Sequence, residues 1–278
     1  MKGTITPASI PSYDVTKLLQ LPPVVSKVGT RIVSPDPGVI AKVSAMYDIS
    51  EEVVGTQFAY RHGLPVPYIF NHSPVSRTTP YVRQVLKPSY IAMQHIPGVP
   101  LSDVLDGLSV EDLERIAYQL KDIVGRLRKI RPPKPWLGSV TGGPYRNNLM
   151  FSLRSPKHAF STCGEFVDYY RDILMLFCTE SFTESLLARL PRNAPIVFTH
   201  GDFGPTNIMV DGSTVTGIID WECAGFYPEY FERARMCDPA MAVPNWKHIT
   251  QLVFPEPQSM DEVSAMCKVL STIAYNLG

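Results

Sequence analysis

The pattern of apolar residues changes near residue 97, and this change restricts the fold more than any other feature of the chain. Before it, short runs of β-branched and aromatic residues alternate with proline and glycine turns, as in a sheet. After it, apolar residues recur at helical spacing. Strands followed by helices are typical of an α+β protein. We therefore expect a small antiparallel β-sheet lobe at residues 1–97 and a larger, mainly helical lobe at residues 98–278.

One hairpin and one helix stand out in the first lobe. The β-branched runs TRIVS and VIAKV are separated by Pro-Asp-Pro-Gly, which is a turn sequence, so a hairpin is predicted with Lys42 near the end of its second strand. Ser50 is predicted to cap a helix, because Glu51 and Glu52 behind it suit the positive end of a helix. Gly63 is predicted to end that helix.

The other elements are predicted from the same periodicities and turn residues. Two further strands are expected, YVRQVL at residues 81–86 and YIAMQHI at residues 90–96, and residues 1–26 are expected to form an irregular lead-in. The second lobe is predicted to hold helices at residues 109–127, 165–176, 182–190 and 261–277. The first of these helices begins with a capping pattern at Ser109.

The composition excludes several classes of function. The 26 basic residues balance the 26 acidic ones, so no net charge attracts the chain to nucleic acid or to a membrane surface. No run approaches the roughly 20 apolar residues that span a bilayer, and the N-terminal sequence lacks the apolar core of a signal peptide, which favours a cytoplasmic protein. The five cysteines are scattered and odd in number, so free thiols are expected. Nothing in the sequence indicates an obligate protein partner.

The sequence FTHGDFGPTNIMVDGSTVTGIIDWE contains the densest group of residues suited to catalysis. Two short β-branched runs in it flank Asp-Gly-Ser-Thr, a tight-turn sequence, so a second hairpin is predicted. If Val210 pairs with Val215, Asn207 lies opposite Ile218. Asp220 then lies within about two residues of Asn207, or roughly 7 Å along a strand. The oxygens of Asn207 and Asp220 are therefore predicted to hold one hard cation such as Mg²⁺.

Asp202 lies in the loop that leads into this hairpin, a few residues from the predicted metal pair. Its carboxylate is suited to orient an acceptor hydroxyl group and to receive its proton. A metal site that bridges phosphates, with a base aligned on the nucleophile, supplies the polar groups of phosphoryl transfer. His200, two residues earlier, is predicted to hydrogen-bond the loop backbone or the surroundings of Asp220 rather than to transfer a proton.

These residues carry a resemblance to a known family. His200-Gly-Asp202, with Asn207 five residues after the aspartate and then Ile-Asp220-Trp-Glu222, resembles the Brenner motif and metal aspartate of the aminoglycoside phosphotransferase (APH) superfamily. The segment GIIDWECAGFYPEYFE is similar to that of fungal-type APH-like phosphotransferases. The resemblance implies a two-lobed, protein-kinase-like fold and ATP, with GTP possible, as the donor. It also implies Asp202 as the base and Asn207 with Asp220 as Mg²⁺ ligands.

The resemblance extends more loosely over most of the chain. Lys42 matches the family's phosphate-binding lysine, and the following helix matches the one that carries the glutamate partner of that lysine. The spacing to the later prolines favours Glu51 as this partner, with Glu52 as the alternative. Residues 90–98 are similar to the strand and hinge whose backbone receives the purine. The nucleotide contacts that this implies are Gln94, His95 and Ile96.

The expected reaction is transfer of a γ-phosphoryl group to a hydroxyl group of a small molecule, such as a metabolite, amino alcohol, sugar or natural product. A choline- or ethanolamine-type kinase of the same fold is an alternative, whereas a protein kinase is disfavoured because no H-R-D, D-F-G or A-P-E set is present. A pseudokinase that binds a nucleotide or a partner is a further alternative, since no G-x-G-x-x-G precedes Lys42. A metal-dependent hydrolase is disfavoured, because the sequence has no further histidines at the spacing of metal ligands.

The acceptor is not defined by the sequence. Its specificity is expected to come from residues 140–190 and 225–278 of the helical lobe. Glu222 and Glu229 suit either a cationic acceptor or a structural role, and the sequence does not separate the two.

Overall fold

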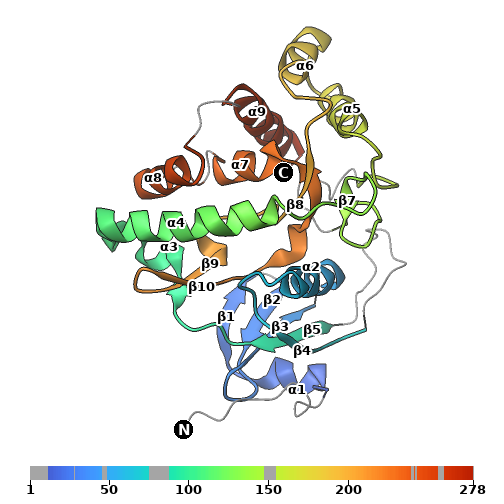
Figure 1. Ribbon diagram of the computed structural model, residues 1–278. Helices are drawn as coiled ribbons and strands as arrows, with labels where there is room; N and C mark the ends of the chain where they lie inside the picture. Colours follow the sequence, from blue (N-terminus) through green and yellow to red (C-terminus); the bar gives the residue numbers. More distant parts are fainter. Residues whose placement is uncertain are drawn as a thin grey trace.

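The computed structural model shows an α+β molecule with two lobes (Figure 1). The residues it describes are 12–27, 29–45, 49–74, 88–146, 155–238, 241, 243–255 and 260–277. The strand expected at residues 81–86 lies outside these ranges. Within them, a five-stranded sheet with two helices forms the first lobe, and the remaining helices with two small sheets form the second. The α+β prediction is confirmed.

The first lobe is built on an antiparallel sheet in the order β1-β2-β3-β5-β4. Its strands are β1 (Pro23–Lys27), β2 (Thr30–Val33), β3 (Val39–Ser44), β4 (Ile69–His72) and β5 (Ser89–Gln94). β2 and β3 form the hairpin that the sequence predicts. Side chains alternate between the faces of a strand. Ala41 and Val43 therefore pack with Leu18 on one face, and Lys42 points to the other.

Two helices cover the two faces of this sheet. α1 (Val15–Gln20) lies on the outer face, and α2 (Ser50–Arg61) lies between the sheet and the second lobe (Figure 1). Gly63, with φ +70°, follows the end of α2 as predicted. The face that carries Lys42 is therefore the one that α2 shares with the second lobe.

Two local predictions for the first lobe are wrong. The described part of the lead-in, residues 12–26, is not irregular, because it contains α1 and most of β1. Proline is tolerated at the start of β1 because this strand lies at the edge of the sheet, where no partner needs its missing N–H. Ser50 is not the cap of α2, since Ile49 holds the N-cap position without a side-chain hydrogen bond and Ser50 is buried within the helix.

Four helices of the second lobe are predicted within a few residues of their ends: α4 (Val110–Leu127), α5 (Cys163–Leu174), α6 (Glu180–Leu187) and α9 (Met260–Leu277). Ser109 caps α4 as expected, because its Oγ accepts a hydrogen bond of 3.1 Å from the Asp112 amide. The sequence did not predict α7 (Tyr230–Met236) or α8 (Pro244–Val253). α7 is short and buried almost all round, so it has no polar face that would give it a helical period.

Short strands complete the second lobe. They are β6 (Val99–Pro100), β7 (Gly138–Ser139), β8 (Ile196–Thr199), β9 (Ile208–Asp211), β10 (Thr214–Ile218) and β11 (Gly225–Pro228), and a short helix, α3 (Leu101–Val104), follows β6. They form two sheets, in the orders β10-β9-β6 and β7-β11-β8.

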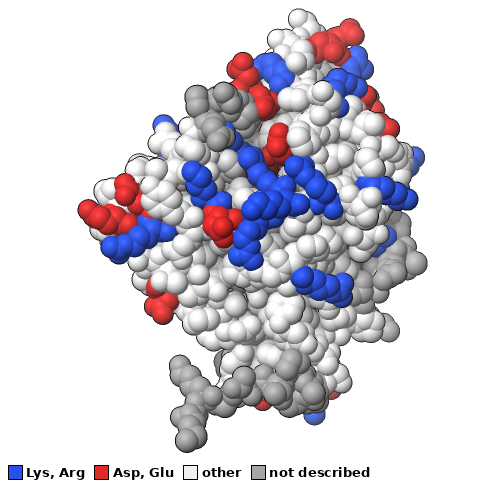
Figure 2. All heavy atoms as spheres, in the orientation of Figure 1, with Lys and Arg blue, Asp and Glu red and all other residues white. Residues whose placement is uncertain are grey.

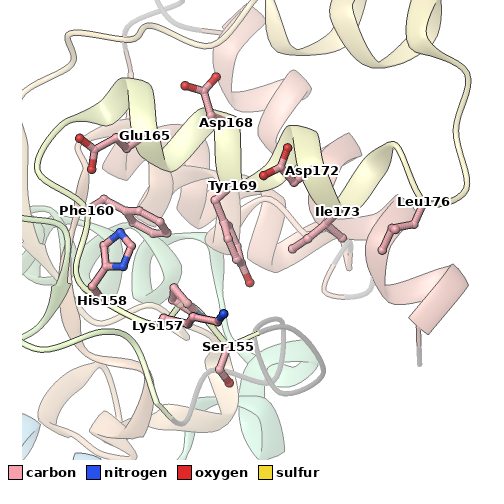
Figure 3. Close-up of a pocket in the computed structure, with 11 residues that line it drawn as sticks. Ser155, Lys157, His158, Phe160, Glu165, Asp168, Tyr169, Asp172, Ile173 and Leu176 are labelled. Atoms are coloured by element: carbon pink, nitrogen blue, oxygen red, sulfur yellow. The ribbon is translucent and has the colours of Figure 1, made fainter.

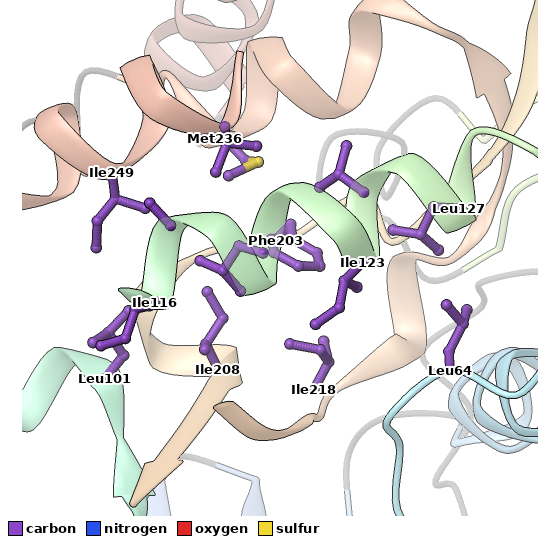
Figure 4. Close-up of a cluster of buried hydrophobic side chains, with 14 of the residues drawn as sticks. Leu64, Leu101, Ile116, Ile123, Leu127, Phe203, Ile208, Ile218, Met236 and Ile249 are labelled. Carbon is purple, nitrogen blue, oxygen red and sulfur yellow. The ribbon is translucent and has the colours of Figure 1, made fainter. Parts of the chain in front are cut away.

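The largest core lies under α4 and supports the β9–β10 hairpin. Ile116, Ile123 and Leu127 of α4 point into it, together with Ile208 and Ile218 of the hairpin (Figure 4). α8 packs on α4 from the opposite side, where Ile249 is fully buried (Figure 4). The hairpin is thus held against a long helix by apolar burial, which is the dominant stabilising term in folding.

The charged side chains are not evenly spread over the surface (Figure 2). Lys and Arg side chains gather near the middle of one face, with acidic side chains beside them and at the margins (Figure 2). The balanced total charge is therefore unevenly distributed over this face. Among the described residues, no helix is both long and apolar enough to cross a bilayer.

Candidate active site

The β9–β10 hairpin has the predicted pairing at its turn and a different register at its open end. Val210 pairs with Val215, as the sequence predicts, but the register shifts after Val215 because an extra residue bulges from β10. The Ile219 amide consequently donates to the Asn207 carbonyl at 2.9 Å. Asn207 therefore lies opposite Ile219, and the predicted pairing with Ile218 was wrong by one residue. Because of the bulge, the position opposite Asn207 is one residue from Asp220 instead of two.

Asp220 has an unusual backbone conformation. Its φ of 63° lies in the left-handed region, and among the described residues it is the one non-glycine residue with a positive φ. Such a conformation is costly and clusters at functional sites. It lies two residues after the end of β10 and leads into a single 3₁₀ turn at Trp221–Cys223. The chain thus turns sharply at the residue predicted to hold a metal.

Lys42 joins the two lobes at this point. Its Nζ lies 2.9 Å from Oδ1 of Asp220, 2.7 Å from Oε2 of Glu52 and 3.9 Å from Oε2 of Glu222. Burial lowers the pKa of Lys42, but the attraction of the three carboxylates outweighs burial and the net shift is upward. Lys42 is therefore charged in the folded protein.

Three carboxylates around one lysine leave an excess of negative charge. Among the described residues, Glu52, Asp220 and Glu222 each offer one oxygen within 4.8 Å of the others. Burial, followed by repulsion from Asp220, raises the pKa of Glu222 to about 7. Burial likewise raises the pKa of Glu52 to about 7, although Lys42 opposes that shift. Oxygen ligands with uncompensated negative charge are the donor set that Mg²⁺ prefers, so these residues fit a divalent cation.

The two consecutive glutamates of α2 make different contacts. Glu52 is the ion-pair partner of Lys42, whereas Glu51 accepts a hydrogen bond of 2.7 Å from the Ser139 hydroxyl in the second lobe. The preference for Glu51 that the sequence suggested was therefore wrong. Neighbouring residues of a helix point about 100° apart, so only one of the two can face β3.

Asp202 is fixed through both oxygens of its carboxylate. Oδ2 accepts a hydrogen bond of 2.9 Å from Nδ2 of Asn207, and Oδ1 accepts one of 2.9 Å from Nη2 of Arg235. Nδ2 of Asn207 also donates to the Asp202 carbonyl at 2.9 Å. The amide oxygen of Asn207 consequently lies on the side away from Asp202. The Asp202 side chain remains 35% exposed, so it is accessible from the surface.

His200 supports the loop from inside. Its Nδ1 accepts a hydrogen bond of 3.2 Å from the Asp202 amide, which makes Nε2 the donor to the Ile219 carbonyl at 3.0 Å. Burial lowers the pKa of His200, so the ring is neutral. These contacts agree with the structural role that the sequence predicts, because the ring connects the loop of Asp202 to the residue before Asp220.

Sequence reasoning missed two residues of α7 that hold the same loop. Glu232 is buried, and its two oxygens accept hydrogen bonds from the His200 amide at 2.6 Å and the Gly201 amide at 3.1 Å. Arg235 donates to Asp202 from the same helix. The available signal was the group of three charged residues in the segment YFERARM, two of which, Glu232 and Arg235, the missed helix turns toward the loop.

The predicted hinge offers fewer free groups than expected. The Gln94 amide donates to the Tyr68 carbonyl at 2.8 Å, and the His95 amide donates to the Gly38 carbonyl at 2.9 Å. Neither amide is free for a ligand in this conformation. Ile96 is buried, and its side chain lies so close to Gly217 that a β-carbon there would approach it to 3.0 Å. Of the three predicted contacts, Ile96 is the one whose amide is not used by these hinge bonds.

A pocket lies elsewhere, beside α5. It measures about 530 Å³ and combines aromatic side chains with acidic ones, among them Phe160, Tyr169 and Asp172 (Figure 3). None of the residues predicted for the nucleotide, the metal or the base lines it. It falls within residues 140–190, where acceptor specificity is expected.

Comparison with known proteins gives a consistent result. Residues 47–253 match the family model described as the phosphotransferase enzyme family. No curated protein sequence gives a significant match. Solved structures with a similar fold include aminoglycoside phosphotransferase APH(4)-Ia, with 17% identity, a TM-score of 0.62, and coverage of 92% of this chain and 86% of that one.

Two further similar structures are ternary complexes. One is a thermostable mutant of APH(4)-Ia with AMP-PNP and hygromycin B, at 15% identity and a TM-score of 0.62, covering 91% of this chain and 84% of that one. The other is the streptomycin–ATP–APH(2")-IIa complex, at 13% identity and a TM-score of 0.59, covering 95% and 89%. At these identities the likeness concerns the fold, and it confirms the predicted two-lobed, kinase-like architecture.

Proposed function

This chain belongs to the phosphotransferase enzyme family, and we propose that it transfers the γ-phosphoryl group of a nucleoside triphosphate to a hydroxyl group of a small molecule. We favour ATP as the donor, with GTP as the alternative. The observation that carries the proposal is the contact of Lys42 with Asp220 at 2.9 Å, since it joins the sheet lobe to the open end of the β9–β10 hairpin, beside Asn207 and the loop of Asp202. Membership of the fungal-type subgroup stays a prediction.

The residues divide the work according to their charge. Lys42 would bind the α- and β-phosphates, and its ion pair with Glu52 would orient its ammonium group. Asp220 and Asn207 would hold Mg²⁺, with Glu222 near enough to contribute an oxygen. The chemistry that the bound cation would supply is neutralisation of negative charge on the phosphate groups. Asp202 would orient the acceptor hydroxyl and take its proton.

The purine would lie against the hinge. Since the amides of Gln94 and His95 already donate to protein carbonyls, the Ile96 amide is the donor that we assign to it. The carbonyl groups of the hinge would accept from the purine in return. The backbone is thus the expected source of nucleotide recognition, whereas the side chain of His95 is exposed and is given no role.

The acceptor is proposed as a class only. The structural relatives that hold a nucleotide together with hygromycin B or streptomycin support a hydroxylated small molecule. A metabolite, amino alcohol, sugar or natural product is compatible with the same chemistry. The helical lobe would select among them. No role for nucleic acid, membrane or an obligate protein partner enters the proposal.

A lobe boundary at residues 97 and 98 is supported because the five-stranded sheet ends at Gln94 whereas β6, at Val99–Pro100, pairs with β9 of the second lobe. A cytoplasmic site of action is supported by the five cysteines, all of which are free thiols.

A nucleotide-binding module without transfer is the second candidate. The observation in its favour is the turn between β1 and β2, where Gly29 is the glycine available to approach a phosphate. A glycine-poor turn offers fewer close backbone contacts to phosphates. This candidate predicts nucleotide binding without turnover.

The test is calorimetric titration of ATP and GTP into the purified protein, with and without Mg²⁺. We expect Mg²⁺-dependent binding that the substitution Asp220→Asn weakens about tenfold or more, because an amide replaces a charged ligand. Asparagine tolerates the left-handed backbone, so the fold is preserved. Asp211→Asn is the matched control, since Asp211 is an exposed residue of the same hairpin.

Two outcomes would contradict the proposal. Absence of binding of either nucleotide would remove the phosphate site. Binding by Asp220→Asn equal to that of the unsubstituted protein would remove Asp220 from the metal site.

A further inference from the structure

Arg235 has an unusual position for a charged residue. It lies on α7, and its side chain is only 14% exposed. Each of its nitrogens has its own acceptor: Nε donates to the Gly201 carbonyl at 2.9 Å, Nη2 to Oδ1 of Asp202 at 2.9 Å, and Nη1 to Oδ2 of Asp238 at 3.3 Å. We call residues 200–202 the catalytic loop. The planar guanidinium therefore contacts the backbone and a side chain of this loop at the same time.

This contact differs from the other arginine–carboxylate pairs of the described residues. In those pairs the arginine side chains are 38–65% exposed. Exposed pairs contribute little to stability, and a buried pair loses much of its attraction to the cost of removing both charges from water. Stability alone therefore gives little reason for a sheltered arginine beside Asp202.

α7 holds the catalytic loop through two opposite charges. Glu232 accepts hydrogen bonds from the amides of His200 and Gly201, and Arg235 donates to the carbonyl of Gly201 and to the Asp202 carboxylate. The two residues are three positions apart, so they lie on one face of the helix. One charge fixes the N–H groups of the loop, and the other fixes its oxygens.

The carboxylate of Asp202 is thereby held in one orientation. Arg235 holds Oδ1, and Asn207 holds Oδ2 at 2.9 Å. Each oxygen of a carboxylate has two lone pairs, so a hydroxyl group can still donate to either. A lysine at position 235 would keep the charge, but its single ammonium group lacks the fork that binds two acceptors in fixed geometry.

We propose that Arg235 is a positioning residue for phosphoryl transfer, which it serves by aiming the Asp202 carboxylate at the acceptor hydroxyl. The inference rests on the proposed function. In the reaction, the acceptor oxygen bonds to the γ-phosphorus while the bond from that phosphorus to the β,γ-bridging oxygen breaks. The hydroxyl proton passes to Asp202, and the nucleoside diphosphate leaves. Arg235 contacts none of the reacting atoms and acts through Asp202.

The test compares Arg235→Gln, Arg235→Lys and the unsubstituted protein. Water serves as the acceptor, so turnover is measured as Mg²⁺-dependent ATP hydrolysis, and ATP affinity is measured by calorimetry. We expect Arg235→Gln to lower turnover about 10²-fold while ATP affinity stays within about twofold, because misplacement of a catalytic group costs about this much. Arg235→Lys should recover part of the loss.

Arg192→Gln is the matched control. Arg192 forms a two-bonded pair with Asp168, at 2.6 and 2.9 Å, on the exposed surface of the helical lobe. Its loss should leave turnover unchanged. A purely structural role of Arg235 would instead lower the melting temperature and the ATP affinity together, and the lysine variant would then give no selective recovery of turnover.

A crystal structure of Arg235→Gln tests the inference without an activity. We expect the Asp202 carboxylate to rotate away from Asn207. An unrotated carboxylate, or turnover equal to that of the unsubstituted protein, would overturn the positioning role while the proposed function stands. Failure of the unsubstituted protein to bind ATP would instead overturn the proposed function, so the two failures are distinguishable.

Discussion

The two sides of the candidate active site are held in different ways. On the side of the first lobe, Lys42 is surrounded by the carboxylates of Glu52, Asp220 and Glu222. On the side of the catalytic loop, backbone groups are held by hydrogen bonds with Glu232 of α7 and with the ring of His200. Charges that share one lysine can rearrange when a charged ligand arrives, whereas a hydrogen-bonded backbone stays fixed. The difference suggests that the first side adapts to the nucleotide and the second stays rigid.

The position of α2 connects the Lys42 side of the site to the second lobe. Glu51 of α2 accepts from Ser139 in the second lobe, and Gly55 lies against the Trp221 carbonyl, which a β-carbon there would approach to 2.5 Å. The helix that carries Glu52 is thus seated directly on the chain that follows Asp220. Only glycine permits this approach.

The strongest test of the comparison is Asp202→Ala. We expect turnover with water as the acceptor to fall by roughly 10²–10⁴-fold, because the group that orients and deprotonates the hydroxyl is lost. ATP affinity should change little, since Asp202 is not proposed to contact the nucleotide. Asp211→Ala, in the hairpin that follows the loop of Asp202, is the control. Full turnover of Asp202→Ala would remove Asp202 from the mechanism.

The rigidity of the loop is tested by Glu232→Gln. The amide group keeps one acceptor oxygen for the two backbone donors, so one buried N–H loses its partner at a cost of about 1–3 kcal/mol in the free energy of unfolding. Turnover should fall about tenfold or more as the loop loosens. Urea unfolding together with ATP hydrolysis measures both effects. A loss of stability with unchanged turnover would show that the loop tolerates movement.

The adaptable side is tested by Glu52→Gln. The substitution removes the negative charge of residue 52 beside Lys42. Asp220, at 2.9 Å, then becomes the nearest charged partner of Lys42. We expect ATP affinity to fall about tenfold, because a hydrogen bond to a charged group contributes about 1.5–3 kcal/mol. Calorimetry provides the measurement. Unchanged affinity would mean that Lys42 needs no fixed partner to bind phosphates.

The smallest effect is expected for Glu51→Gln, the neighbouring control. Glutamine retains an oxygen that accepts from Ser139, so α2 should keep its contact with the second lobe. ATP affinity and turnover should remain within about twofold. A larger loss than that of Glu52→Gln would reverse the assignment of the two glutamates.

Much of the fold follows from local sequence patterns. The hairpin that carries Lys42 and the hairpin of Asn207 were predicted because their turns contain Gly with Pro or Asp. α4 was predicted because its apolar residues form a stripe and Ser109 caps it. The motif from His200 to Glu222 indicates the family through the spacing of its residues alone. These signals are local, since each depends on residues that lie close together along the chain.

The remaining features depended on tertiary contacts. The bulge in β10 and the choice of Glu52 over Glu51 have no local signal. The charges of Glu232 and Arg235 are visible in the sequence, but the loop that they contact is not. α7 was missed because burial on all sides removes the polar face by which an amphipathic helix is recognised.

The sequence by itself determined the two hairpins, the long helix and the motif from His200 to Glu222, because turn residues, periodicity and motif spacing each involve residues close together along the chain. The tertiary structure alone decided which residues far apart along the chain meet. Lys42 and Asp220 are 178 positions apart, and Glu51 and Ser139 are 88 positions apart. Contacts over such separations are selected by the packing of whole elements, which a pattern of neighbouring residues does not contain.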